Sequence, residues 1–412
     1  MRILIVTQYF WPEDFRVNDL ATELTQRGHL VTVLTGQPSY PSRNLFPGYG
    51  RLRPWSQRLG DVRIKRVPLA SRGRGQGWRL ALNFLSFAAS ASLLGPLRAR
   101  GGYDVIFVYE PSPVTVGIPA VVLKRVISAP VVFWVQDLWP ETLTATGAVR
   151  SRVVLKALNR LVRWLYHESD RILVESEGFI PHALSNGAAP EKLAYVPNWA
   201  EGSYRPVDLP GDAAERQLVP PGFRVMFAGN LGVSQALGTI LDAAELTREY
   251  ADLHWVVLGD GRQRAWLAEQ VLTRDLSGTV HLLGRHPVEA MPRFFALAEA
   301  LLVTLKHEPI YALTIPSKLQ SYLACGRPIV GALDGEGARV IAEAGAGLCG
   351  PAEDSEALAQ AVLSLYRTPP DELAAMGRRG RAYFVKHFER ERLLDQLEQS
   401  MRDTSEENRC VS

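Results

Sequence analysis

A phosphate-binding turn is predicted within residues 310–330. Pro316, Ser317 and Lys318 form a short polar turn before an apolar helical segment that ends at Gly326. The first turn of a helix carries free amide groups and the positive end of the helix dipole, which attract a phosphate. Proline in that turn forfeits no hydrogen bond, Ser317 can donate one, and Lys318 supplies a full charge. The alternative interpretation is an ordinary capped helix between two core strands.

Two glycine-rich turns follow neighbouring apolar runs in the second half of the chain. The tetrapeptide Gly229-Asn230-Leu231-Gly232 comes directly after residues 224–228, and Gly259-Asp260-Gly261 comes after the next run. Glycine allows a phosphate to approach the backbone closely, so both turns are candidates for a phosphate or nucleoside contact. Each also fits a plain strand-to-helix turn, with Asp260 as a helix cap.

Carboxylate and guanidinium groups mark two turns in the first half of the chain. Asp137 and Glu141 follow the apolar run 131–135, and Arg16 closes the first loop after the opening run. A carboxylate at a strand end can position an acceptor hydroxyl or take its proton. A guanidinium binds phosphate oxygens in pairs, so Arg16 can contact a phosphate. The alternatives are Asp137 as a cap and Arg16 on a solvated helix face.

The elements that must position these residues alternate along the chain. Short Val- and Ile-rich runs are separated by longer segments of helical period, a pattern that predicts parallel sheets covered by helices on both faces. The predicted strands are 3–7, 30–35, 62–67, 105–109, 131–135, 172–174, 193–196, 224–228, 253–258, 280–283, 300–305, 328–330 and 347–349. This is an α/β chain, and we expect two doubly wound, Rossmann-like domains that face a central cleft, where ligands bind.

A change of composition divides these two domains. Five prolines lie among polar residues between Pro197 and Pro221, where periodicity is lost. We therefore predict a first domain at 1–198, a linker at 199–221 and a second domain at 222–380. Residues 381–412 are predicted to hold a helix that crosses back to the first domain, followed by a disordered tail after Asp403.

A basic, aromatic segment precedes the most apolar helix of the chain. Residues 43–79 contain ten Lys and Arg residues against the single acid Asp61, interleaved with Trp, Tyr and Phe. Such a segment, with the apolar stretch 80–97, fits an anionic membrane surface. A solvated face around a core helix and a nucleic acid partner are the alternatives, and we expect no nucleic acid. The basic residues are Arg43, Arg51, Arg53, Arg58, Arg63, Lys65, Arg66, Arg72, Arg74 and Arg79.

The composition is that of a globular protein in a reducing compartment. The 412 residues are 47% hydrophobic and 22% charged, with a net charge of +3. Three widely spaced cysteines, without a CxxC or Cys/His cluster, indicate neither a disulfide framework nor a zinc site. The opening MRILIVTQYF predicts a first strand rather than a signal peptide. We expect a cytoplasmic protein.

An ordered series of motifs carries a family resemblance along nearly the whole chain. The motifs are YFWPED, VQDLWPET, VPNW, AGNLG, VLGDG, HLLGR, LTIPSKLQSYLACGRPIV and DGEGARVIAEAGAGL. In these segments the chain resembles the retaining glycosyltransferases of family 4, which have the GT-B fold. Among them it is similar to bacterial polysaccharide enzymes of the fucosamine and colanic acid type.

The resemblance implies an enzyme that moves a hexose or N-acetylaminosugar from a nucleotide-sugar, expected to be a UDP-sugar. The implied acceptor is a lipid-linked or other saccharide, and anomeric configuration is retained. The implied setting is exopolysaccharide or lipopolysaccharide biosynthesis, peripheral on the inner face of the cytoplasmic membrane. It also implies no metal or other cofactor, since helix dipoles and cationic side chains take the metal's role.

The implied roles divide between the two domains. Asp137 and Lys318 are the candidate catalytic residues, and Arg16, Asp137 and Glu141 lie on the acceptor side. The candidate donor-binding residues are Gly229, Asn230, Gly232, Asp260, Gly284, Arg285, Lys306, Ser317, Lys318 and Ser321. Of these, Asp260, Gly284 and Arg285 are assigned to the nucleoside.

Three departures from the family pattern keep other functions open. The two positions where members commonly carry Glu are Leu313 and Ser321, and a common Arg and Lys pair is replaced by Asn230 and Gln235. A common His is Gln136. A catalytically silent scaffold that binds a sugar nucleotide is one alternative, and a non-hydrolysing nucleotide-sugar 2-epimerase is another.

Overall fold

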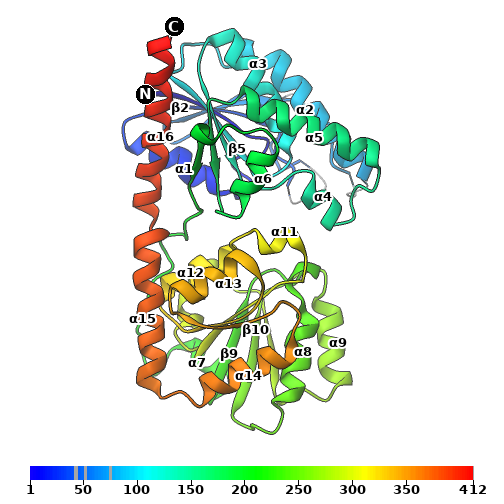
Figure 1. Ribbon diagram of the computed structural model, residues 1–412, viewed down its shortest axis with the longest axis vertical. Helices are drawn as coiled ribbons and strands as arrows, with labels where there is room; N and C mark the ends of the chain where they lie inside the picture. The colour runs from blue at the N-terminus through cyan, green and yellow to red at the C-terminus, as the bar shows by residue number, and fades with distance from the viewer. Residues whose placement is uncertain (41–44, 51–52, 74–76, 412) are drawn as a thin grey trace. The chain divides into compact units, whose positions relative to one another are not determined.

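The chain folds into two units, each built around one sheet. The computed structural model describes residues 1–40, 45–50, 53–73 and 77–411. The first unit comprises Met1–Val196 with Leu394–Ser412, and the second comprises Pro197–Leu393 (Figure 1). The basic residues Arg43, Arg51 and Arg74 of the predicted membrane segment lie outside the described residues.

The sheet of the first unit has eight strands in the order β3-β4-β2-β1-β5-β6-β7-β8. Only β3 runs antiparallel to its neighbour. The strands are β1 (Arg2–Val6), β2 (Leu30–Gly36), β3 (Ser56–Leu59), β4 (Val62–Val67), β5 (Val105–Glu110), β6 (Val131–Val135), β7 (Arg171–Val174) and β8 (Leu193–Tyr195). The central strands β1, β5 and β6 are apolar and almost wholly buried, as expected for parallel strands covered on both faces.

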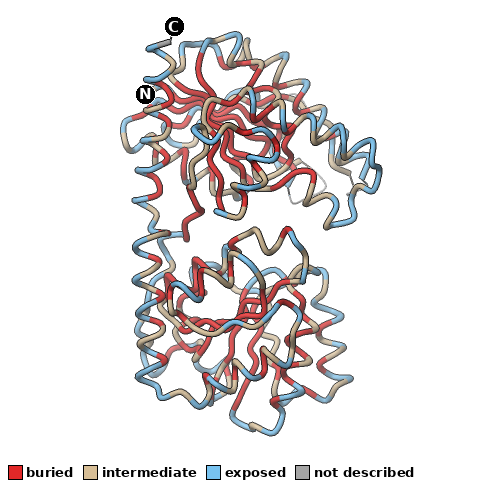
Figure 2. The backbone as a smooth tube through the Cα atoms, viewed as in Figure 1, coloured by how far each residue is buried: buried red, intermediate tan, exposed pale blue. Residues whose placement is uncertain are grey.

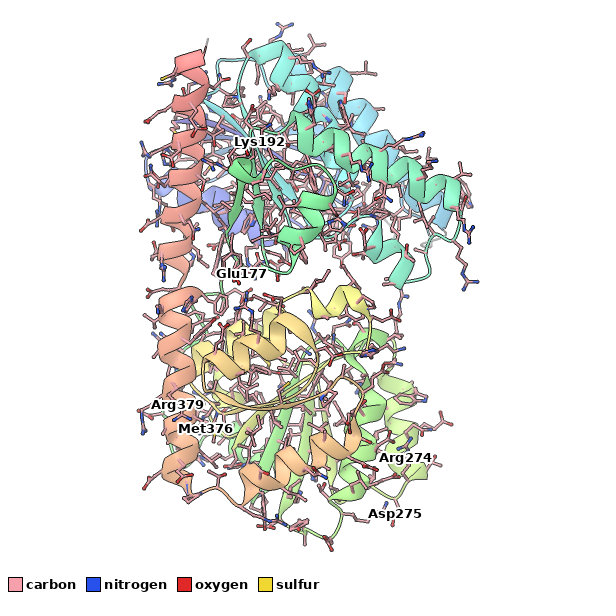
Figure 3. The ribbon with its side chains drawn as sticks, viewed as in Figure 1. Glu177, Lys192, Arg274, Asp275, Met376 and Arg379 are labelled. Atoms are coloured by element: carbon pink, nitrogen blue, oxygen red, sulfur yellow. The ribbon has the colours of Figure 1, made fainter. Side chains whose placement is uncertain are left out.

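Helices cover this sheet and anchor its loops. They are α1 (Arg16–Gln26), α2 (Gly77–Arg98), α3 (Gly117–Ile127), α4 (Glu141–Ala145), α5 (Arg152–Glu168), α6 (Phe179–Ser185) and α16 (Arg390–Val411), with 3-10 turns at Val114–Val116 and Pro190–Lys192. Lys192, labelled in Figure 3, donates to the carbonyl oxygens of His167 and Ser169 at 3.2 and 2.8 Å. This satisfies carbonyls at the end of α5 and fixes the start of β7.

The sheet of the second unit has six parallel strands in the order β11-β10-β9-β12-β13-β14. They are β9 (Phe223–Ala228), β10 (Leu253–Leu258), β11 (Val280–Gly284), β12 (Ala300–Thr304), β13 (Ile329–Ala332) and β14 (Gly347–Gly350). The helices are α7 (Ala214–Leu218), α8 (Leu237–Leu246), α9 (Arg264–Thr273), α10 (Met291–Phe295), α11 (Pro309–Ala312), α12 (Ser317–Cys325), α13 (Gly335–Glu343), α14 (Ser355–Tyr366) and α15 (Pro370–His387), with 3-10 turns at Val233–Gln235 and Val288–Ala290. Two buried apolar clusters lie in this unit, and red backbone in Figure 2 follows its strands.

All thirteen predicted strands are present, most within a residue of the predicted ends. Among the described strands, sequence reasoning missed β3, whose residues SQRL carry no apolar alternation and are alternately exposed and half-buried. It is an edge strand, where packing against a core does not select apolar residues.

The segment predicted as a linker packs as part of the second unit. Tyr204 stacks on Phe295 with ring centroids 6.1 Å apart. Glu215 of α7 pairs with Arg293 of α10 through two hydrogen bonds of 2.6 and 2.9 Å. These contacts hold the segment against the second unit, so it is not a free connection.

The C-terminal helix returns to the first unit, as predicted, but the predicted disordered tail is wrong. Helix α15 ends at His387, before Phe388, and α16 then runs from Arg390 to Val411. Its residues Leu394, Leu397 and Met401 are fully buried. Thr404 and Ser405, one helical turn further on, are also buried. The polar composition of the tail conceals the continuing helical spacing of these inward positions.

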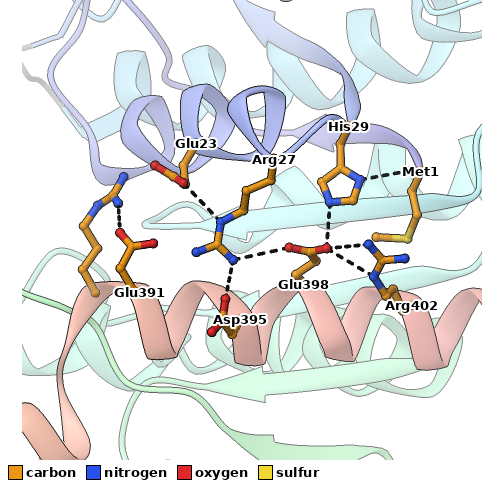
Figure 4. A network of polar contacts seen from close by, with 9 residues as sticks. Met1, Glu23, Arg27, His29, Glu391, Asp395, Glu398 and Arg402 are labelled. Atoms are coloured by element: carbon orange, nitrogen blue, oxygen red, sulfur yellow. Dashed lines mark hydrogen bonds and ion pairs between the residues drawn. The ribbon is translucent and has the colours of Figure 1, made fainter.

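Ion pairs fix α16 to the first unit (Figure 4). Arg27 pairs with Asp395 at 2.5 Å and with Glu398 at 3.4 Å, and His29 contacts Glu398 at 3.0 Å. Although burial raises the pKa of Glu398, its hydrogen bonds with Arg402 and His29 hold that pKa below its ordinary value.

Candidate active site

In the second unit, the predicted phosphate-binding turn lies at the carboxyl edge of the sheet. Helix α12 begins at Ser317, directly after Pro316 in an extended conformation, and ends at Gly326 with φ of 65°. That left-handed conformation is unfavourable for a side chain, so glycine ends the helix there. Ser317 is exposed at the open end of α12, and Lys318 is partly exposed.

Lys318 points its ammonium group at the loop after β9. Its Nζ donates to Oε1 of Gln235 and lies 3.8 Å from the centroid of the Phe227 ring. In the described part of the chain, no carboxylate pairs with it. Burial lowers the pKa of Lys318 to about 7, because the nearby neutral groups do not replace the hydration of a full charge.

Helix α12 is held in place by a hydroxyl group at its buried face. The Tyr322 hydroxyl accepts from the Ala228 amide at 2.9 Å and donates to the Ala228 carbonyl at 3.2 Å. Because Ala228 is the last residue of β9, this pair fixes the spacing between Lys318 and the loop that begins at Gly229. Sequence reasoning did not select Tyr322, Phe227 or Gln235 as site residues.

The two predicted glycine turns cross at very close range. A Cβ on Gly259 would lie 1.8 Å from the carbonyl oxygen of Gly229, and one on Gly261 would lie 2.5 Å from that of Leu231. The Gly229 amide donates to Leu258, and the Leu231 amide donates to Asp260, at 3.0 and 2.8 Å. These turns therefore need glycine for backbone packing, and the same packing leaves Gly229 within reach of Lys318: a Cβ there would lie 3.5 Å from its Nζ.

The other predicted donor residues surround this crossing. Asn230, Asp260 and Arg285 are exposed, and Gly284 accepts at its carbonyl from the Gly259 amide at 2.7 Å. Asp260 caps the next residue, since its Oδ1 accepts from the Gly261 amide at 2.8 Å. The structure thus brings the turns after β9, β10 and β11 together.

Lys306 and Ser321 occupy two different environments. Lys306 follows β12 and lines a cavity of about 240 Å³, with Gln263, Glu353 and the residues around Gly238. Ser321 is 8% exposed on the inner part of α12, one turn beyond Ser317. Gly232 is partly exposed in the loop that leads to the 3-10 turn at Val233–Gln235. Lys306 joins that loop through its amide, which donates to the Ser234 carbonyl at 3.0 Å.

In the first unit, three carboxyl side chains stand at the ends of three adjacent strands. Glu110 is the last residue of β5, Asp137 follows β6 by two residues, and Glu175 directly follows β7. The strands end abreast, because Glu110 is in register with Val135 and Val135 with Val174. Sequence reasoning selected only Asp137, although the same strand-end position marks Glu110 and Glu175.

Asp137 is held by its own turn. Its Oδ1 accepts from the Thr142 hydroxyl at 2.5 Å. Burial raises the pKa of Asp137, while hydrogen bonds from Thr142, Trp139 and Ser112 oppose the rise. The carboxylate therefore has a fixed direction.

Glu110 and Glu175 are more deeply buried. Glu110 is 0% exposed, and among the described residues its carboxyl oxygens have no hydrogen-bond partner of ordinary geometry, although the backbone amides of Gln136 and Asp137 act on them. Burial raises the pKa of Glu110 well above its ordinary value, and the charge of Asp137 adds to the rise. Burial raises the pKa of Glu175 to about 8, and the positive charge of Arg16 opposes it. At neutral pH Glu175 therefore holds a proton that it can donate in a hydrogen bond, and the raised pKa of Glu110 favours its neutral form.

The other acceptor-side candidates differ in their surroundings. Arg16 is the first residue of α1, partly exposed, and its charge acts on Glu175 and Tyr109. Glu141 instead contacts His182 at 2.9 Å. Although burial raises the pKa of Glu141, the hydrogen bond and charge of His182 hold it below its ordinary value. Arg16 thus interacts with Glu175, one of the three strand-end carboxyls, whereas Glu141 pairs with His182 of α6.

These arrangements suit the binding of an anion in one unit and of hydroxyl groups in the other. Lysine and free amides complement phosphate oxygens, and buried carboxyls exchange hydrogen bonds with hydroxyls. In the described part of the chain, no group of three or more His, Cys, Asp or Glu side chains is arranged to hold a metal ion. The acidic turn Asp334-Gly335-Glu336 opens α13, and Asp334 accepts from His307 at 2.8 Å rather than capping the helix.

Two parallel-sheet units with ligand-competent residues at their carboxyl edges define the GT-B class of glycosyltransferase folds. Among solved structures, sucrose-phosphate synthase from Thermosynechococcus elongatus has a TM-score of 0.72 at 17% identity, and the match covers 98% of this chain and 98% of the synthase. Anabaena Alr3699/HepE in complex with UDP-glucose has a TM-score of 0.68 at 16% identity, covering 98% of this chain and all of that one.

The sequence itself matches glycosyltransferase families in both units. Residues 15–199 match the glycosyl transferase 4-like domain, and residues 222–368 match glycosyl transferases group 1. The putative colanic acid biosynthesis glycosyl transferase WcaI of Escherichia coli K12 is 25% identical over 338 residues, which are 79% of this chain and 82% of that protein. The chain belongs to the group 1, family 4 glycosyltransferases and is a glycosyltransferase enzyme.

Proposed function

We propose that this enzyme moves a sugar from a nucleotide-sugar to a lipid-linked or other saccharide acceptor, with retention of configuration, during cell-surface polysaccharide biosynthesis. The observation that carries the donor half is the Lys318 ammonium, which lies beside the Gly229 turn with an amide oxygen and an aromatic ring as its neighbours. A diphosphate supplies the negative charge that these neighbours lack.

The donor is proposed to be a UDP-sugar bound without metal. The complex of HepE with UDP-glucose supports the choice of base, because it has the same fold. Lys318, the exposed Ser317 at the open end of α12 and the amides near Gly232 bind the diphosphate, while Asp260 and Arg285 lie in the turns nearest the nucleoside. Lys318 also stabilises the charge that develops on the leaving diphosphate, so it serves binding and catalysis.

The acceptor is proposed to lie against the three strand-end carboxyls of the first unit, Glu110, Asp137 and Glu175. Asp137, with its direction fixed by Thr142, accepts a hydrogen bond from the acceptor hydroxyl. The raised pKa values of Glu110 and Glu175 favour their neutral forms, which keeps the charge beside Asp137 low enough for a neutral sugar. In a retaining reaction the leaving phosphate can take the acceptor proton on the donor face, so Gln136 at the place of a common His is compatible with transfer.

The location is proposed to be the inner face of the cytoplasmic membrane, reached through residues 43–97. By length and composition alone α2 could cross a membrane, and 28% of its apolar window is buried. Leu85, Leu93 and Trp78 on it are 58%, 74% and 63% exposed, which favours contact with lipid. The prediction needs one correction: Arg66 is fully buried, donating to Gln57 and Gly36, and cannot contact a membrane.

The test is a donor screen followed by a transfer assay. UDP, GDP, ADP and dTDP with their common sugar conjugates are titrated by calorimetry without metal, and the donor that binds is then incubated with membrane lipid extract. We expect one base to bind and a glycosylated lipid to form. Binding without transfer to any extract or saccharide contradicts the proposed acceptor class, and the absence of nucleotide binding contradicts the proposed donor.

A further inference from the structure

A basic site other than Lys318 lies in the first unit, away from the strand-end carboxyls Glu110, Asp137 and Glu175. Four arginines line an open cavity of about 280 Å³ together with Asp61, Tyr103 and residues at the start of β2. They are Arg2, Arg58, Arg63 and Arg100. Arg2 begins β1 and Arg63 is the second residue of β4, so the cavity opens at the amino-terminal edge of the sheet, where the strands begin.

The register of the sheet directs three of these arginines to one face. Arg2 is paired with Leu30, and Thr32 with Arg63. Paired residues share a face, and so do residues two apart on one strand, so Arg2 and Arg63 lie on the same side. Arg58 is directly opposite Arg63 across the antiparallel pair and shares that side.

The charges of the cavity are not balanced within the protein. Like charges directly opposite each other in a sheet are unfavourable, and Arg58 and Arg63 are such a pair. Asp61 is the one carboxylate among the lining residues. Across the described residues, none of the four guanidinium groups forms an ion pair. Burial lowers the pKa of His29, also on the lining, so this imidazole adds little charge at neutral pH.

We propose that this cavity binds a phosphate group, carried either by a membrane lipid or by a soluble molecule. Guanidinium groups on several elements can each give paired hydrogen bonds to phosphate oxygens, which a lysine point charge cannot. The site is separate from the proposed donor site and does not depend on it. Arg58 and Arg63 belong to the segment proposed to contact the membrane, so the lipid form of this inference rests on that part of the proposed function.

The test compares two double variants with the same loss of charge. Arg63→Gln/Arg100→Gln removes half of the cavity's arginines. Arg160→Gln/Arg163→Gln removes two exposed arginines of α5 and is the matched control. Pyrophosphate is titrated by calorimetry into each, in a Lys318→Ala background so that the proposed donor site contributes little. We expect the cavity variant to bind at least tenfold more weakly than the control.

A second arm separates the two sources of phosphate. Each protein is sedimented with vesicles of phosphatidylcholine, with and without phosphatidylglycerol. A lipid headgroup as ligand predicts that only the cavity variant stays in solution and that pyrophosphate releases the control. A soluble ligand predicts equal sedimentation of the two variants together with the difference in pyrophosphate affinity. Equal behaviour in both arms overturns the proposal, and far-ultraviolet circular dichroism checks that both variants are folded.

Discussion

At the scale of single residues, Lys318 combines a charge with an environment that does not neutralise it. Its partner Gln235 offers a carbonyl dipole, and Phe227 offers the face of a ring. Both orient an ammonium group, but neither supplies the full negative charge that a buried cation requires. The resting protein thus keeps this side chain at a cost that the proposed diphosphate would remove.

Lys318→Ala is therefore expected to weaken UDP binding by roughly 1 to 3 kcal/mol, the range for a charge-assisted contact. Calorimetry measures the change. Lys156→Ala, which removes an exposed lysine of α5, is the control and should bind UDP as the unmodified protein does. Equal affinity of the two variants would remove Lys318 from the donor site.

The lowered pKa of Lys318 also predicts how stability depends on pH. Below about pH 7 this lysine is protonated in both the folded and the unfolded chain, so the full cost of its burial is present. Between about pH 7 and 10.5 the unfolded chain binds more protons, so stability should rise with pH. Lys318→Met removes this contribution.

We accordingly expect the Lys318→Met protein to melt at least about 2 °C higher than the unmodified protein at pH 6.5. The difference should shrink towards pH 9.5. Thermal unfolding of both proteins at several pH values measures it, and all other titrating groups cancel in the difference. Parallel curves would mean that the ammonium is hydrated at both extremes.

At the scale of elements, the turns after β9 and β10 form one compact crossing. Gly259 has φ of 140°, and its α-carbon faces the carbonyl oxygen of Gly229. A side chain at that position must displace backbone rather than another side chain. The crossing therefore sets the shape of the surface that Lys318 approaches.

Gly259→Ala should destabilise the protein by at least about 2 kcal/mol, because a Cβ 1.8 Å from an oxygen forces the two turns apart. Urea unfolding followed by circular dichroism measures the loss. Gly278→Ala is the matched control, since no atom lies within 4 Å of its Cβ position. If the two variants unfold alike, the crossing is looser than described.

The sequence predicted these elements well and the site only in part. Val- and Ile-rich runs such as 253–258 determine strands by themselves, because burial on both faces selects such residues. Lys318, Asp137 and the glycine turns could be selected as candidates from residue type and position, and their roles stay predictions. Glu110 ends its strand in the same way as Glu175 and could have been selected by that position, whereas Gln235 has no charge and gains importance only from neighbours brought together by folding. Arg66 was misplaced because a buried arginine and an exposed one look alike in sequence.

At the scale of the whole molecule, α16 completes the first unit from the far end of the chain. Leu397 is fully buried on this helix, and Glu398 beside it accepts from Arg27 and Arg402. The apolar contacts and the ion pairs lie along the same two turns. The helix is thus a structural part of the unit rather than an appended tail.

Leu397→Ala is expected to lower the free energy of unfolding by about 2 to 5 kcal/mol, as for other leucines truncated in a core. Chemical unfolding of the full chain measures it. Gln399→Ala changes an exposed position of the same helix and should leave stability within about 0.5 kcal/mol. A loss of similar size in both variants would show that the burial of Leu397 is not what sets the contribution of this helix to stability.

The return of α16 also fixes an order of events during synthesis. The ribosome releases residues 1–196 first, but the helix that pairs with Arg27 and His29 of this unit is translated last, after every residue of the second unit. Until α16 has been synthesised, the first unit therefore exposes apolar surface to solvent on the nascent chain, a state that chaperones bind. A stop codon anywhere before Leu394 leaves that surface permanently uncovered, so even a short truncation at this end should be cleared as a misfolded protein.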